Sequence, residues 1–134
     1  DDRLVTLAMT AGLLHDVGKI GVPDRILLKP GPLDDEEWAL VRQHAQIGAD
    51  IIGRHDNELL ATARTIALTH HERWDGTGYP QGLQGEQIPL FGRIVAIADV
   101  FDALMNHRPY RPAMSAAEAL TEEAVNRLVH ELRP

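Results

Sequence analysis

The sequence predicts an all-α fold, a helical bundle of about five helices. Apolar residues recur at helical spacing along several long stretches, and no stretch shows the strict alternation of apolar and polar residues that is typical of a strand. Hydrophobic residues make up 44% of the 134 residues, enough for a buried core, and no apolar run is long enough to span a membrane. We therefore expect residues 1–134 to form a single domain.

The first predicted helix covers residues 3–16. Leu4, Leu7, Ala11 and Leu14 share one face at helical spacing, and the next residue, a histidine, borders that face. A glycine two residues after the helix is expected to end it.

Two further helices are predicted in the first half of the chain. Asp34 begins the second, because Glu37 stands three residues later and completes the pattern of a capping box. Its inward face includes His44. The third helix runs from residue 58 to residue 71 and carries His70 in register with its apolar residues.

The second half of the chain begins with a long glycine-rich loop, residues 72–87. Compact domains keep such long loops mainly where they have a use. Residues 89–104 are apolar on nearly every side, which predicts a central, buried helix in which Asp99 and Asp102 need partners. Ser115 is expected to begin a last helix that ends near residue 132.

Composition excludes some functions. The chain has no cysteine, so neither a disulfide framework nor a cysteine-ligated zinc site can form. A net charge of −7 argues against a DNA- or RNA-binding surface, because neutralising phosphates requires clustered Lys and Arg. A small anionic substrate remains compatible with this charge if metals and a few local cations supply a positive field. The lack of cysteine also suits a cytoplasmic protein.

Six metal-capable side chains fall on inward or terminal positions of four predicted helices. They are His15, Asp16, His44, His70, His71 and Asp99. A single histidine in such a place is most often a core residue with a satisfied hydrogen bond, but six together predict a buried dinuclear metal site. Imidazole nitrogens and carboxylate oxygens suit zinc, iron or manganese. A carboxylate has two oxygens, so Asp16 is the candidate bridge between two metals.

Several motifs in this chain resemble those of a known family. His15-Asp16 together with Asp99 resembles the HD superfamily of metal-dependent phosphohydrolases. Further segments resemble motifs of the HD-GYP branch of this superfamily. They are His70-His71-Glu72-Arg73-Trp74-Asp75-Gly76-Thr77-Gly78-Tyr79-Pro80, residues 23–31, residues 88–90, residues 98–104 and Arg108-Pro109-Tyr110-Arg111. The resemblance covers about residues 4–120.

The resemblance implies an all-α bacterial signalling enzyme that hydrolyses the second messenger cyclic di-GMP to pGpG, and onward to GMP. Two divalent metals, iron or manganese first and zinc, nickel or magnesium as alternatives, would activate a water molecule for the attack. His15, Asp16 and Asp99 would hold one metal. Asp16 would also hold the other, together with His44, His70 and His71.

The same resemblance assigns the substrate contacts. Lys19 would face the substrate phosphate and act with Asp16 in catalysis. Arg108 and Arg111 would bind the phosphates of the dinucleotide, since guanidinium donors match phosphate oxygens two at a time. Gly78 and Tyr79 would form part of the substrate wall, in a loop that also contacts GGDEF-domain partners. Lys19, Arg108 and Arg111 could instead be solvated surface charges, and the loop a plain glycine-rich turn.

The chain departs from the family pattern at both ends. The pattern begins with a further His on an upstream helix, whereas residues 1–14 contain neither His nor Glu. The C-terminal segment lacks the Gly and Phe-Asp-Pro of the family. We therefore expect a piece of a larger protein with an upstream sensory or receiver domain, a weakly filled first metal position, and slow turnover. The alternatives are a degenerate domain that binds a nucleotide or partner without turnover, and a hydrolase of another cyclic dinucleotide or nucleotide.

Overall fold

A computed structural model of the chain describes residues 1–106, 113, 115–119 and 121. The chain divides into two compact units, Asp1–Val95 and Ala96–Pro134. The described residues form helices and no strand, apart from one isolated bridge between Asp75 and Gln84. The prediction of an all-α fold is confirmed. No helix in the described part of the chain is long and apolar enough to cross a membrane.

Helix α1 (Asp2–Gly12) begins at Asp1, whose carboxylate accepts a hydrogen bond from the amide of Arg3 at 2.9 Å. It ends at Gly12, earlier than the predicted residue 16. Turns follow, and the chain then enters the short 3₁₀ helix η1 (Val17–Gly21). His15 and the residue after it therefore lie in the turn between α1 and η1, not at a helix end.

Helices α2 (Asp24–Leu27) and α3 (Asp35–Arg42) follow. The predicted capping box at Asp34 is present, since the Glu37 amide donates to Asp34 Oδ1 at 2.8 Å and the Asp34 amide donates to Glu37 Oε2 at 2.9 Å.

The second predicted helix is interrupted at Gln43, where α3 ends and α4 (His44–Ile52) begins. At the interruption the imidazole of His44 bonds to the Val41 carbonyl at 2.6 Å. In an uninterrupted helix that carbonyl would serve the amide four residues on.

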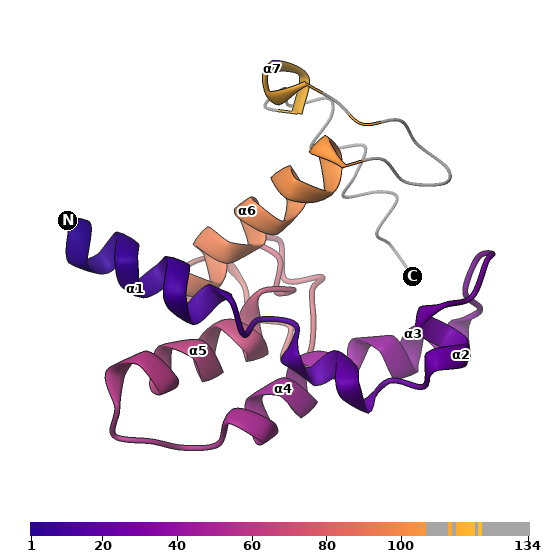
Figure 1. Ribbon diagram of the computed structural model, residues 1–134, viewed down its shortest axis with the longest axis horizontal. Helices are drawn as coiled ribbons and strands as arrows, with labels where there is room; N and C mark the ends of the chain where they lie inside the picture. The colour runs from indigo at the N-terminus through magenta and orange to yellow at the C-terminus, as the bar shows by residue number, and fades with distance from the viewer. Residues whose placement is uncertain (107–112, 114, 120, 122–134) are drawn as a thin grey trace. The chain divides into compact units, whose positions relative to one another are not determined.

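Helix α5 (Glu58–Thr69) lies against both α1 and α4, and α4 also contacts η1 (Figure 1). Asn57 caps α5 by accepting from the Leu60 amide at 3.1 Å. The buried residues of the first unit are mostly small, which lets the helices approach closely. Its core cluster consists of Ala11, Ala63, Ile66 and Val95, with Ile52 and Phe91 packed against it.

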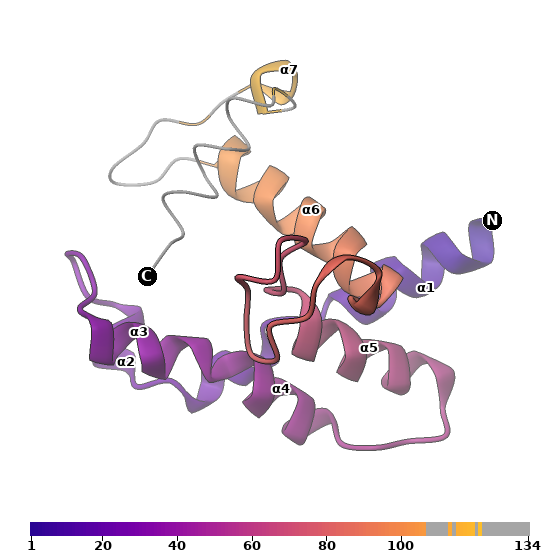
Figure 2. The ribbon, with the colours of Figure 1, turned by 180° about the vertical axis from the view of Figure 1, so that it is seen from behind.

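The glycine-rich loop after α5 contains a short 3₁₀ helix, η2 (Gly85–Gln87), and passes in front of the ends of α4 and α5 (Figure 2). Helix α6 (Leu90–Met105) follows. On α6, Ile97 is 72% exposed and Asp102 is also exposed, so the expectation that this helix is buried on all sides is wrong. Asp102 nevertheless has a partner, the side-chain amide of Asn106 at 3.1 Å.

The second unit has a small cluster of its own, made of Leu104 and Ala119 with Val100, Phe101 and Ala103. Ser115 precedes α7 (Ala116–Ala119), and its hydroxyl accepts from the Glu118 amide at 3.2 Å, as its predicted capping role requires. Helix α7 ends at Ala119 and Thr121 lies in a bend, so the prediction of one continuous helix to residue 132 is wrong at this point. Residues 122–132 lie outside the described residues.

Candidate metal centre

The site begins with a close approach between η1 and α4. A Cβ added to Gly18 would lie 1.8 Å from the carbonyl oxygen of His44 and 2.5 Å from the amide nitrogen of Gly48. Only glycine can occupy that position without moving one of the two elements. Asp16 directly precedes η1, so this contact places Asp16 near the beginning of α4.

The carboxylate of Asp16 lies among three histidines and a lysine. Its Oδ1 is 3.4 Å from His44 Nε2 and 3.4 Å from His70 Nε2. Its Oδ2 is 3.2 Å from His15 Nε2 and 3.1 Å from Lys19 Nζ. The turn after α1 thus joins side chains from α4 and from the end of α5.

Hydrogen bonds fix which nitrogen of each histidine faces the carboxylate. His44 Nδ1 donates to the Val41 carbonyl at 2.6 Å, and His15 Nδ1 donates to the Gly12 carbonyl at 2.7 Å. His70 Nδ1 is shared between two carbonyls of its own helix, both at 3.0 Å. Because a carbonyl can only accept, each Nδ1 carries the proton, and in the neutral imidazole Nε2 presents a lone pair. This is how histidines are oriented for metal binding.

Three of these atoms are buried without a hydrogen-bond partner: Asp16 Oδ1, His44 Nε2 and His70 Nε2. Leaving three buried polar atoms unsatisfied is costly, and all three are electron-pair donors. Donor atoms of Asp16, His44, His70 and His71 lie within 4.8 Å of one another. A divalent cation would satisfy all of them, so this set of residues fits a metal ion.

The electrostatics of Asp16 favour the ionised ligand. Burial by itself raises the pKa of the Asp16 carboxyl. The charge of Lys19, whose Nζ lies 3.1 Å from Asp16 Oδ2, acts against this effect of burial, and the pKa is held below its usual range. The carboxylate is therefore ready to bind a cation without first losing a proton.

The remaining predicted residues fall in different places. Lys19, half-exposed, pairs with Asp16. Gly78 and Tyr79 lie in the loop beside His71, where the Tyr79 amide donates to the His71 carbonyl. Asp99 lies on α6 in the second unit, so its part in the first metal position stays a prediction. The predicted phosphate-binding residues Arg108 and Arg111 lie outside the described residues.

Sequence reasoning missed three residues around the site: Gly18, whose role is packing rather than ending a helix, and Arg42 and Glu72. Glu72 is 4% exposed, and its position directly after the His-His pair was the available signal. Nothing in the pattern around Arg42 distinguishes it from an ordinary residue near a helix end.

The chain belongs to the HD domain family, whose model matches residues 1–127. The resemblance inferred from the sequence motifs is confirmed.

The chain is also similar in sequence to several named proteins. The chain is 53% identical over 120 residues to a protein of Vibrio cholerae named cyclic di-GMP phosphodiesterase, covering 86% of this chain and 24% of that protein. It is 52% identical over 118 residues to a Thermotoga maritima protein of the same name, covering 88% and 32%. A 3'3'-cGAMP-specific phosphodiesterase of Vibrio cholerae is 55% identical over 101 residues, covering 75% and 19%. The chain thus spans less than a third of the length of these relatives.

Proposed function

We propose that this chain is a metal-dependent phosphodiesterase domain that hydrolyses cyclic di-GMP to pGpG and GMP. The observation that carries the proposal is the convergence of Asp16 Oδ1, His44 Nε2 and His70 Nε2, three buried donor atoms without partners. The relatives named cyclic di-GMP phosphodiesterases support the choice of substrate.

In this proposal the site holds two divalent metals, iron or manganese. Bound metals would lower the pKa of a water molecule and neutralise the charge that develops on phosphate oxygens. Asp16 would contact both ions, and His44, His70 and His71 would complete one of the positions. His15 and Asp99 would complete the other.

Lys19 adds positive charge at the edge of the site. Its ammonium is paired with Asp16 Oδ2, and its side chain is 46% exposed, so a substrate phosphate can reach it from solvent. We infer that Lys19 exchanges part of this ion pair for a phosphate oxygen when substrate binds. Arg108 and Arg111 would supply further phosphate contacts.

A second substrate deserves a direct comparison, because a 3'3'-cGAMP-specific phosphodiesterase is among the relatives. Both nucleotides present the same phosphodiester to the metals and differ in one base. The metal ligands therefore favour neither substrate, and discrimination must come from contacts to the bases.

The test is hydrolysis by the chain reconstituted with Mn²⁺, with cyclic di-GMP and 3'3'-cGAMP offered separately and the products separated by chromatography. We expect pGpG and then GMP from cyclic di-GMP, with no product after chelation or in His44→Ala. Faster turnover of 3'3'-cGAMP would assign the second substrate. A metal-loaded protein that binds either nucleotide without hydrolysing it would identify a binding module instead.

A further inference from the structure

The ring of Tyr79 stacks on the imidazole of His71. Their centroids are 4.9 Å apart and their planes differ by 15°. His71 lies in the turn after α5 and not within the helix. The rings of His44 and His70 are oriented by Nδ1 hydrogen bonds to carbonyls near their own positions. The ring of His71 lies nearly parallel to the ring of Tyr79.

The backbone around Tyr79 rests directly on the segment that carries His71. The Tyr79 amide donates to the His71 carbonyl at 3.2 Å. A Cβ added to the preceding residue, Gly78, would lie 2.4 Å from both the Arg73 amide nitrogen and the His71 carbonyl oxygen. The chain can approach this closely only with glycine at position 78, so Tyr79 is placed by backbone packing as well as by its ring.

Glu72 connects the part of the loop that follows Tyr79 to the segment that carries His71. Its two carboxylate oxygens accept hydrogen bonds from the Gln81 amide at 2.7 Å and the Leu83 amide at 2.9 Å. Hydrogen bonds to a buried ionised group are among the stronger ones in proteins. The residue next to His71 therefore holds the chain on the far side of Tyr79, and the loop folds back over the end of α5.

Arg42, from the end of α3, covers Tyr79. Its Cζ atom is 5.8 Å from the centroid of the Tyr79 ring, within range of a cation–π interaction. The ring of His44 meets the same tyrosine edge-on, with centroids 6.4 Å apart. The half-buried Tyr79 ring thus contacts residues from α3, from the beginning of α4 and from the turn after α5.

We propose that Tyr79 is a positioning residue: it holds the His71 imidazole in the orientation required of a metal ligand, and Glu72 and Arg42 hold Tyr79 in place. This role differs from the substrate contact that the sequence predicts for Tyr79. It rests on the proposed metal centre, in which His71 is a ligand. The glycine-rich loop is then a fixed support for that centre.

The test compares Tyr79→Leu, which removes the ring, with Tyr79→Phe, which keeps it. The Mn²⁺ dissociation constant is measured by competition with a chromogenic chelator, well below the unfolding midpoint of each variant. Residues that orient metal ligands typically contribute about 10–100-fold to affinity. We expect a loss of that size in Tyr79→Leu and wild-type affinity in Tyr79→Phe.

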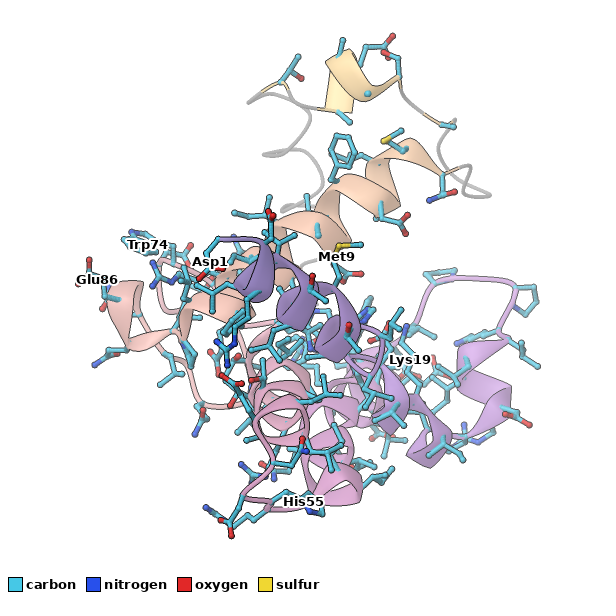
Figure 3. The ribbon with its side chains drawn as sticks, turned by 60° about the vertical axis from the view of Figure 1, so that its left-hand side comes forward. Asp1, Met9, Lys19, His55, Trp74 and Glu86 are labelled. Carbon is cyan, nitrogen blue, oxygen red and sulfur yellow. The ribbon has the colours of Figure 1, made fainter. Side chains whose placement is uncertain are left out.

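Glu72→Gln tests the two hydrogen bonds that Glu72 accepts from the loop, because a side-chain amide has only one acceptor oxygen and a carboxylate has two. We expect weaker Mn²⁺ binding in Glu72→Gln. The matched control is Glu86→Gln, since Glu86 is exposed at the outer edge of the same loop (Figure 3). Its affinity should equal that of the wild type.

A second readout separates positioning from general stability. In imidazole NMR spectra of the metal-free protein, the stacked tyrosine should shift the His71 ring protons, and this shift should disappear in Tyr79→Leu and persist in Tyr79→Phe. Equal Mn²⁺ affinity in Tyr79→Leu and wild type would overturn the positioning role while leaving the metal centre intact. A wild-type chain that binds no Mn²⁺ would overturn the metal centre, and this role with it.

Discussion

The α-carbon of Gly18 lies so close to the backbone of His44 that a Cβ there would be 1.8 Å from the His44 carbonyl oxygen. The contact joins η1 to α4 and so brings Asp16 to the histidines. The same backbone packing therefore stabilises the fold and assembles the candidate metal centre.

Gly18→Ala should be severely destabilising, because backbone on the opposite side cannot move away as a flexible side chain can. We expect a loss of about 4 kcal/mol or more in the free energy of unfolding, or no folded protein at all. Urea unfolding monitored by circular dichroism gives the measurement. Gly31→Ala is the control, since no atom lies within 4 Å of a Cβ at that position, and it should unfold like the wild type.

Acid should expose the contribution of Glu37. A hydrogen bond from Lys29, with Nζ 2.6 Å from Glu37 Oε2, and a second from the Asp34 backbone lower the pKa of the Glu37 carboxyl. A carboxyl with a lower pKa in the folded protein stabilises it above the unfolded-state pKa, and this stabilisation is lost as the pH falls through the folded-state value. As the pH falls below about 4.5, the ordinary pKa of a glutamate, the wild type should therefore lose stability more steeply than Glu37→Gln.

Urea unfolding at several pH values tests this difference. Because the Lys29 ion pair is exposed to solvent screening, added salt should reduce the gap between the two proteins. Parallel pH profiles for wild type and Glu37→Gln would show that the pairing contributes nothing.

Arg108→Ala and Arg111→Ala should weaken cyclic di-GMP binding and leave the metal content unchanged. A lost hydrogen bond to a charged group costs about 1.5–3 kcal/mol, or roughly ten- to a hundredfold in affinity. Calorimetric titration of each variant with the nucleotide, beside elemental analysis, measures both quantities. Unchanged affinity in both variants would return these residues to the class of surface charges.

Local patterns predicted the parts of this fold that depend on nearby residues. The capping box at Asp34 and Glu37 involves neighbours in one turn, and the sequence places it correctly. The interruption at Gln43 was not predicted, because apolar spacing continues across it and nothing in the pattern marks a break. The apolar residues along α6 predicted a helix buried on all sides, and this pattern gave no indication that Ile97 would be exposed.

The candidate site follows the same division. Histidines and aspartates can be recognised in a sequence as candidate metal ligands, because their side chains carry suitable donor atoms. Four of the six predicted ligands have donor atoms within 4.8 Å of one another. Glu72 and Arg42 act through contacts that only the folded chain creates. Glu72 accepts hydrogen bonds from backbone amides nine and eleven residues away. Its position beside two histidines does not predict that these amides are its partners.

The most direct test of the metal centre is elemental analysis and cyclic di-GMP hydrolysis on the same preparation of wild type and Asp16→Asn, purified without chelator. Asp16 is the residue on which the histidines converge, and asparagine keeps its shape while removing the charge. We expect metal and turnover in the wild type, and the loss of both in Asp16→Asn with the helical circular dichroism spectrum retained. A folded Asp16→Asn protein that keeps the wild-type metal content and rate would contradict the central role of this carboxylate.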